Sequence, residues 1–196
     1  MTQFKVLIEG YAKPTGGKAF KASPTTTLII DSGKNILVDP GASKSKLIAA
    51  LKAEDIFLKD IDLIFLTHYH PDHFLNIRLF PDVDVYDGST IYRDDEELEF
   101  FGNIPGTAVK IVPTPGHASE HVSLVIRTSE GRVCIAGDLW WWMDGVKQMT
   151  DRKSLLSLKD PFVKDKRALL ESRKKILAMA DIIIPGHGKV FRVKLK

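Results

Sequence analysis

Cysteine is almost absent from this chain of 196 residues, which has only Cys134, within "RVCIAGD". A single cysteine excludes an internal disulfide framework, and the N-terminal "MTQFKVLIEGYAK" lacks the long apolar segment of a secretory signal. No apolar run reaches the roughly 18 residues that a membrane-spanning helix needs. These absences predict a cytoplasmic protein with no membrane association.

The chain also lacks a strong excess of charge of either sign. It has 28 Lys and Arg residues against 25 Asp and Glu residues, and a net charge of +3 does not demand a nucleic-acid partner. The hydrophobic fraction of 44% and the charged fraction of 27% are typical of a folded protein. With no internal repeat or low-complexity segment, residues 1–196 are predicted to form a single domain, whose oligomeric state the composition leaves open.

Short apolar segments bounded by turn residues predict most of the strands. "TTTLIIDSGKNILVDPG" indicates two strands joined by a turn at 31–34, and "VSLVIRTSEGRVCIAGD" indicates a hairpin that turns at 129–131. The apolar run at 61–66 is typical of a central strand covered on both faces. Further strands are expected in "VDVYDG", "VKIVPTPGH" and "DIIIPGHG".

Helices are expected in two places between these strands. "SKSKLIAALKAED" has helical spacing, with Ser43 or Ser45 as its cap, and Asp160 followed by Pro161 resembles the start of a helix that continues to about residue 180. The acidic stretch "RDDEELE" at 93–99 indicates a solvated loop or helix. Strands that alternate with helices and end at polar residues, such as His117 and Asp138, predict an α/β fold with a site at one sheet edge.

The densest group of candidate functional residues lies in "LTHYHPDHFLN", which holds His68, His70, Asp72 and His73. Imidazole and carboxylate groups bind Zn²⁺ and similar ions, and their crowding in one turn favours a metal site over chance. The only cysteine lies within a predicted strand, which argues against a thiolate site. A lone histidine such as His121 is more often a hydrogen-bonded structural imidazole than a ligand.

Four motifs in order, "THYHPDH", "TPGHASEH", "AGDLW" and "IPGHG", resemble the successive motifs of the metallo-β-lactamase superfamily, and "ILVDPG" at 36–41 resembles its opening motif. The resemblance runs from residue 36 to residue 188. It implies an αβ/βα four-layer sandwich, in which two facing mixed β-sheets carry helices on their outer faces. It also implies a dinuclear site, with one metal bound by His68, His70 and His117, the second by Asp72, His73 and His187, and both bridged by Asp138.

The resemblance implies hydrolysis by a hydroxide that bridges two divalent ions, because paired ions lower the pKa of bound water to about 7 and polarise a substrate oxygen. Asp72 could also orient the nucleophile or relay a proton. Asp39 could accept the free N–H of a ligand histidine or simply occupy a turn, and His121 is a second candidate for such a supporting role. Zinc is the expected metal, with iron and manganese as alternatives.

The leading hypothesis for the substrate is a small-molecule ester, thioester or lactone. His70 stands where oxygen-reducing relatives of the flavodiiron type have glutamate, which disfavours a redox role. Only nine residues follow His187 and the chain is short, so the helical glutathione-binding region of glyoxalase II and the cap or arm of the larger nucleases are not expected.

Two alternatives remain at this point. A compact nuclease for RNA or single-stranded DNA is suggested by ten Lys or Arg against four Asp or Glu between residues 147 and 175, although a solvated helix face is the preferred interpretation. "LTHYHPDH", "RLFPD" and "ESRKKIL…PGHG" also resemble the branch of metallo-β-lactamase domain-containing protein 1, whose animal member is associated with RNA cleavage. Trp140, Trp141 and Trp142 could wall a substrate pocket, stack on a base or pack in the core. The second alternative is a non-catalytic metal-binding interaction protein.

Overall fold

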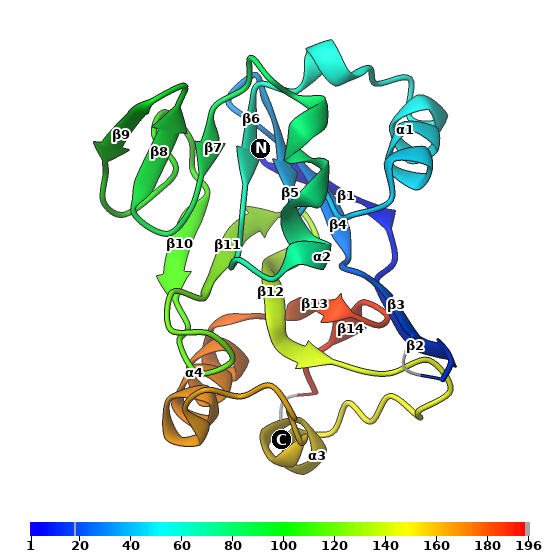
Figure 1. The fold of residues 1–196 in the computed structure, drawn as a ribbon. Helices are drawn as coiled ribbons and strands as arrows, with labels where there is room; N and C mark the ends of the chain where they lie inside the picture. The colour runs from blue at the N-terminus through cyan, green and yellow to red at the C-terminus, as the bar shows by residue number, and fades with distance from the viewer. Residues whose placement is uncertain (18, 195–196) are drawn as a thin grey trace.

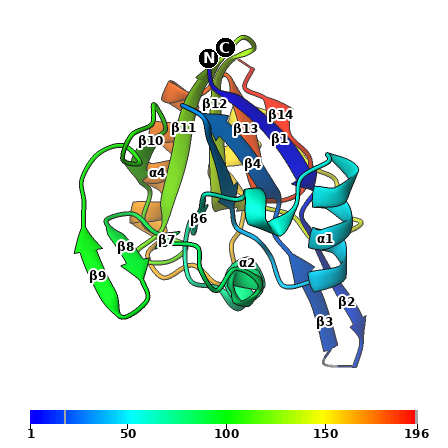
Figure 2. The ribbon, with the colours of Figure 1, turned by 90° about the horizontal axis from the view of Figure 1, so that it is seen from above.

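Two β-sheets face each other in the computed structural model, which describes residues 1–17 and 19–194 (Figure 1). The first sheet contains, in spatial order, β1 (Gln3–Ile8), β4 (Thr26–Asp31), β5 (Lys34–Val38), β6 (Leu63–Phe65), β7 (Val85–Tyr86), β8 (Thr90–Arg93) and β9 (Glu96–Glu99). The second contains β10 (Lys110–Pro113), β11 (Val122–Thr128), β12 (Gly131–Trp141), β13 (Ile182–His187) and β14 (Phe191–Arg192). A hairpin of β2 (Tyr11–Gly16) and β3 (Ala19–Ser23) projects from this body (Figure 2).

Helices cover the outer face of each sheet (Figure 2). The first sheet carries α1 (Lys44–Ala53), α2 (Pro71–Phe74) and the 3-10 helices η1 (Leu58–Asp60) and η2 (Leu75–Leu79), and the second carries α3 (Arg152–Ser157) and α4 (Lys166–Met179). No helix in the described part of the chain is long and apolar enough to cross a membrane.

The alternation of side chains along each strand builds the layers. In β4, Ile29 packs between the sheets against residues such as Ile135, while its neighbour Leu28 packs against Leu47 of α1. In β12, Cys134 faces the other way and packs in the apolar cluster that includes helix α4. Because successive strand residues point to opposite faces, each sheet has one apolar face toward its partner and one toward its helices. The predicted four-layer α/β sandwich is confirmed.

Both sheets are mixed, and their parallel pairs point toward the candidate site. β5, β6 and β7 are parallel neighbours, as are β12 and β13, whereas the remaining pairs are antiparallel. Asp39 follows β5 directly, His68 comes shortly after β6, and His187 is the last residue of β13. Parallel strands deliver the residues at their carboxyl ends to one edge of the structure, as the sequence predicts.

Several element predictions are confirmed. The turn at 31–34 joins β4 to β5, the turn at 129–131 joins β11 to β12, and the segment at 61–66 contains the buried strand β6. Helix α1 forms where its spacing predicts, but the hydroxyl of Ser43, at its N-cap position, makes no capping hydrogen bond.

The acidic stretch at 93–99 is neither a loop nor a helix, and that prediction is wrong. β8 and β9 form an antiparallel hairpin there, with Arg93 opposite Glu96. The strand β9 lies at the edge of its sheet with all four residues exposed. Charged side chains on an edge strand stay in water and discourage pairing with another chain, so they are compatible with β-structure here.

The predicted start of the last helix is also wrong. α4 begins at Lys166, because the carboxylate of Asp165 accepts hydrogen bonds from the backbone N–H groups of Arg167 and Ala168. The carboxylate of Asp160 has other partners, described below. The strand predicted to end at Asp138 continues to Trp141 through an irregular register after Gly137. The strand before His117 ends earlier, at Pro113.

Candidate metal centre

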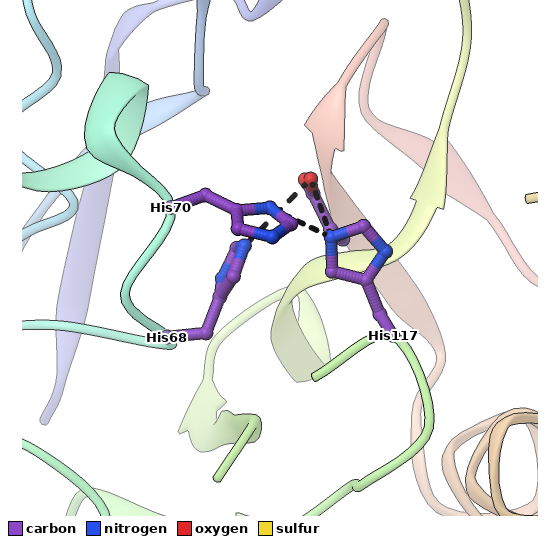
Figure 3. Close-up of side chains that lie close together, drawn as sticks. His68, His70 and His117 are labelled. Atoms are coloured by element: carbon purple, nitrogen blue, oxygen red, sulfur yellow. Dashed lines mark hydrogen bonds and ion pairs between the residues drawn. The ribbon is translucent and has the colours of Figure 1, made fainter. Parts of the chain in front are cut away.

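Four of the seven predicted ligand side chains come from loops or a strand end, two come from a short helix, and one lies within a strand. His68 and His70 follow β6, and Pro71 then starts the short helix α2, which carries Asp72 and His73. The second sheet contributes His117 from the loop after β10, Asp138 from β12, and His187 from the end of β13. Figure 3 shows the imidazoles of His68, His70 and His117 converging on one point.

The structure gathers these seven side chains into two adjoining groups. His68, His70, His117 and Asp138 form one group, and Asp72, His73 and His187 form the other; within each, one potential ligand atom per residue lies within 4.8 Å of all the others. The two carboxylate oxygens of Asp138 face different groups. Oδ2 lies 3.3 Å from Nε2 of His117, whereas Oδ1 lies 3.4 Å from Nε2 of His73 and 3.6 Å from Nε2 of His187.

Hydrogen bonds at the far ring nitrogen orient two of these imidazoles through Asp39. Its Oδ2 accepts from Nδ1 of His73 at 2.9 Å and from the hydroxyl of Thr67 at 2.8 Å, and its Oδ1 accepts from the backbone N–H of Thr67. Because the Thr67 hydroxyl donates to Asp39, its oxygen is left to accept from Nδ1 of His68, 3.1 Å away. In their neutral forms, both histidines therefore present an unprotonated Nε2 to the centre.

His117 and His187, the histidines from the second sheet, are also held by hydrogen bonds at Nδ1. Nδ1 of His117 donates to Oδ2 of Asp160 at 2.7 Å, and Nδ1 of His187 donates to the backbone carbonyl of Tyr11 at 3.1 Å. His70 is turned the other way, since its Nδ1 lies 3.0 Å from Nε2 of His117. Four histidines thus direct Nε2 inward and His70 directs Nδ1 inward, the orientation that ligation of metal by imidazole requires.

Unsatisfied polar atoms at the centre match what metal ions would bind. Among the described residues, Nε2 of His68, Nε2 of His73 and Oδ1 of Asp138 are buried and have no hydrogen-bond partner. Leaving a buried polar atom unpaired costs about 1–3 kcal/mol, so three of them in one place indicate that something binds there. Nitrogen and carboxylate donors suit zinc, iron or manganese, and the residues present fit a pair of such ions.

The ionisation states of His68 and Asp138 suit metal binding directly, whereas His73 must give up a proton to bind metal. Burial and the neighbouring His73 hold the pKa of His68 well below its usual value, so its imidazole is neutral. Burial opposes ionisation of Asp138, but His187 and His73 hold the pKa of its carboxyl well below the usual range. Burial alone would lower the pKa of His73, yet the carboxylates of Asp138 and Asp39 raise it.

Asp138 depends on tight backbone packing and on His121. The backbone N–H of Asp138 donates to Nε2 of His121 at 3.1 Å, and Nδ1 of His121 then donates to the hydroxyl of Thr114 at 2.9 Å. Burial and the nearby His117 lower the pKa of His121 to about 3, which keeps its Nε2 free to accept. A Cβ added at Gly186 would lie 1.8 Å from Oδ1 of Asp138, so any other residue at this position would displace that carboxylate.

A cavity of about 450 Å³ opens beside the metal-ligand candidates. His70, Asp72, Asp138 and His187 form one wall, and the rest is apolar: Ala12, Phe20, Ala22, Ala42, Pro71, Leu75, Trp141 and Phe162. Trp141 stacks on Phe162, with ring centroids 5.6 Å apart. Trp140 and Trp142 lie in the core instead, where both pack against Phe191.

Several residues around the centre are not apparent from the sequence. Asp160 resembles a helix cap, and no sequence signal connects it with His117. Tyr11 acts through its backbone carbonyl, which side-chain motifs cannot reveal. Phe20 and Phe162 reach the cavity from the projecting hairpin and from the segment before α4, and neither belongs to a motif.

Comparisons with known proteins agree with this geometry. The model of the metallo-beta-lactamase superfamily matches residues 21–87. Metallo-beta-lactamase domain-containing protein 1 of Xenopus laevis is 33% identical, over 96% of this chain and 80% of the relative, and the human protein of that name is 30% identical, over 96% and 81%. A probable metallo-hydrolase of Methanocaldococcus jannaschii is 28% identical over 97% of this chain and 90% of its own.

Solved structures share the fold. A protein of Thermotoga maritima of the metallo-beta-lactamase type superposes with a TM-score of 0.72 at 20% identity, covering 97% of this chain and 99% of the other. A dizinc quorum-quenching lactonase superposes with a TM-score of 0.63 at 16% identity (91% and 77%), and a di-iron-bound protein with 0.60 at 20% (91% and 93%). The relatives in sequence establish that the chain belongs to the metallo-β-lactamase superfamily and is a metal-dependent hydrolase.

Proposed function

We propose that the chain hydrolyses small neutral esters, thioesters or lactones that carry an apolar acyl group, using two metal ions. The proposed ligands are His68, His70 and His117 for one ion and Asp72, His73 and His187 for the other, with Asp138 shared. The division of the two Asp138 oxygens between the two groups supports the shared role.

When bound, a pair of divalent ions lowers the pKa of water and polarises a substrate oxygen. The chain's own residues would position the reactants. Asp72 is half-buried, lines the cavity, and has Oδ2 3.4 Å from Nε2 of His187, so its carboxylate can orient a water molecule or take its proton. Asp39 and Asp160 would keep their histidines in fixed rotamers throughout the reaction.

The observation that carries the substrate assignment is the apolar wall that faces the ligand residues. A cavity of about 450 Å³ is within the usual range for small-molecule sites. Phe20, Leu75, Trp141 and Phe162 would hold an acyl chain by burying it, and neither Lys nor Arg lines this cavity in the described part of the chain. Apart from the proposed metal ions, a polyanionic substrate would find no cationic side chain on the wall of this cavity, whereas a neutral acyl compound needs none.

We propose zinc as the native metal, because five imidazoles and two carboxylates match its ligand preference. Both a dizinc and a di-iron protein occur among the proteins of similar fold. Elemental analysis of protein purified without chelators tests the identity. Two zinc equivalents per chain support the proposal, and two iron equivalents would contradict it.

The substrate assignment is tested with nitrophenyl esters, thioesters and lactones of increasing acyl length. Turnover should need metal and the His70 imidazole, so His70→Ala should abolish it. Phe162→Ala should raise KM about tenfold for an octanoyl ester and little for an acetyl ester, since about 1.4 kcal/mol of apolar burial is lost. Phe101→Ala is the matched control, because Phe101 is 86% exposed and does not line the cavity.

The proposal would be overturned if none of these substrates shows metal-dependent turnover, or if the rates do not depend on acyl length. Retained turnover in His70→Ala would count equally against it.

A compact nuclease is the second candidate, and one observation favours it. Lys13, Lys21 and Lys46 line a neighbouring cavity that shares Phe20, Ala22 and Ala42 with the first, so cations lie near its mouth. Incubation with labelled RNA and single-stranded DNA, with His70→Ala as the control, decides between the two. Metal-dependent cleavage of either nucleic acid by the parent protein, lost in Lys13→Glu and Lys46→Glu, would establish the nuclease. Absence of cleavage by the parent protein would exclude it.

A further inference from the structure

Arg173 is a buried cation whose charge is not neutralised by an ion pair. It lies on α4 and is 3% exposed. Its Nε donates to the carbonyl of Leu139 at 2.8 Å and its Nη1 to the carbonyl of Leu158 at 2.6 Å, while Nη2 is buried without a partner among the described residues. It forms no ion pair with a carboxylate in that part of the chain, and burial lowers the pKa of Arg173 to about 10, an effect that the charge of nearby Asp160 offsets only in part. A buried guanidinium normally has an anionic partner, because its desolvation is costly.

Arg173 lines a second cavity, of about 510 Å³, between α3, the segment at 158–165 and α4. This cavity shares no lining residue with the cavity beside the metal-ligand candidates, which we call the substrate cavity. Most of its wall is apolar and is formed by Leu156, Leu158, Pro161, Val163, Leu169 and Leu170. Its polar wall carries the cations Lys159, Lys166 and Arg173.

The one carboxylate on this wall is already engaged. Asp160 accepts from His117 through Oδ2, and its Oδ1 accepts from the backbone N–H of Phe162 at 2.9 Å and from Nε1 of Trp141 at 3.3 Å. It is therefore committed to residues outside the cavity. Three cations beside a leucine-rich wall, with one carboxylate already paired, leave the cavity complementary to an anion that has an apolar body.

We propose that this second cavity binds a small amphipathic monoanion, a carboxylate on an apolar chain, with the carboxylate at Arg173, Lys159 and Lys166 and the chain along the leucines. A tail-less anion would leave the leucines uncovered, and a neutral chain would leave Arg173 unpaired. The inference does not rest on the proposed function, because none of the metal-ligand candidates lines this cavity.

Calorimetric titration of the metal-loaded full chain with decanoate tests the proposal, with decanol and acetate as probes that each lack one half of the ligand. Decanoate should bind saturably and at least about tenfold more tightly than either, since decanol cannot pair with the cations and acetate cannot cover the leucines. Hydrogen exchange should show protection at residues 156–173. Protection confined to 12–22 and 71–75 would place decanoate in the substrate cavity and overturn the proposal.

Charge reversal at the cavity gives the matched comparison. Lys159→Glu and Lys166→Glu, both at exposed positions, should each weaken decanoate binding about tenfold, whereas Lys164→Glu and Arg167→Glu, on the same segment but outside the lining, should not. Arg173→Lys retains the positive charge but loses the planar guanidinium with its several N–H donors, so it should also weaken decanoate binding. Equal affinity in all five variants, or no saturable binding of decanoate, contradicts the inference.

Discussion

Oδ2 of Asp160 and Nδ1 of His117 lie 2.7 Å apart although 43 positions separate them in the chain. Both side chains are buried. The carboxylate accepts a hydrogen bond from Nδ1 and leaves Nε2 facing Asp138. Its other oxygen accepts from Nε1 of Trp141 and from the backbone N–H of Phe162, two residues that line the cavity beside the metal-ligand candidates. One carboxylate therefore positions a metal-ligand candidate and two substrate-contact candidates together.

Removing this carboxylate should weaken metal binding more than it weakens the fold. In Asp160→Ala, His117 loses its anchor, and we expect the affinity for metal to fall about 10- to 100-fold, as measured by competition with a chromophoric chelator. Asp165→Ala is the control, because that carboxylate caps α4 and should cost about 1 kcal/mol of stability without changing metal affinity. Equal affinities in the two variants would show that Asp160 does not position His117.

Gly186→Ala should displace Asp138 by a steric effect. The added methyl would meet Oδ1 of Asp138 at 1.8 Å and the backbone carbon of Gly137 at 2.9 Å, so the carboxylate must move. We expect at least about tenfold weaker metal binding, measured calorimetrically. Gly145→Ala, where a Cβ meets nothing within 4 Å but φ is +84°, should cost about 1 kcal/mol of stability and leave metal binding unchanged. Unaltered metal stoichiometry and affinity in Gly186→Ala would refute the steric argument.

Metal removal should destabilise the whole fold. The buried Nε2 atoms of His68 and His73 then have no partner, and the ions no longer favour the folded state. With free zinc at 100 times its Kd, binding stabilises the folded state by about 2.7 kcal/mol. Chelation should therefore lower Tm by about 5–10 °C. Differential scanning calorimetry with and without chelator measures it. Because the carboxylates of Asp138 and Asp39 raise the pKa of His73 against the opposing effect of burial, zinc binding should also release protons, detectable as a buffer-dependent binding enthalpy.

Acid stability should depend on Asp181, which is remote from the metal-ligand candidates. The hydrogen bonds from the Arg132 side chain and backbone lower its pKa from 3.8 to about 2. A carboxyl with a lowered folded-state pKa stabilises the protein fully above the unfolded value and loses that contribution as the pH falls through the folded value. The unfolding free energy of metal-free protein should therefore exceed that of Asp181→Asn by about 1 kcal/mol at pH 5, after allowance for solvent screening, and the difference should shrink toward pH 2.

Urea titrations of both proteins at several pH values measure this difference. Asp95→Asn, in an exposed turn, serves as the control and should follow the parent chain. A difference that stays constant between pH 5 and pH 2 would contradict the assignment to Asp181.

Local chemistry explains which parts of the fold could be predicted. The turn at Ser32 and Gly33 and the buried strand β6 follow from turn residues and apolar runs, which act over a few positions. The hairpin at 93–99 could not be predicted, because charged residues on an edge strand look like a loop in isolation. The β2–β3 hairpin is equally polar along most of its length and has no neighbouring strand that the sequence would reveal.

In the candidate site too, some residues could be predicted from the sequence and others could not. The predicted ligand residues lie in recognisable motifs, and the structure brings all seven together. Asp39, which orients His73, also lies in one of these motifs. Two other orienting groups do not: the carbonyl of Tyr11 is common to every residue type, and Asp160 competes with a plausible helix-cap interpretation. Partners separated by long stretches of chain are set by how the layers pack, which local patterns do not encode.

The ligand candidates are divided between the two sheets, and this division sets the order in which the site can assemble. His68, His70, Asp72 and His73 belong to the half of the chain that builds the first sheet, and His117, Asp138 and His187 to the half that builds the second. Neither half alone holds a complete set for either ion. The capacity to bind metal tightly therefore arises only when the halves dock, and a zinc-responsive dye added during refolding would report that last step.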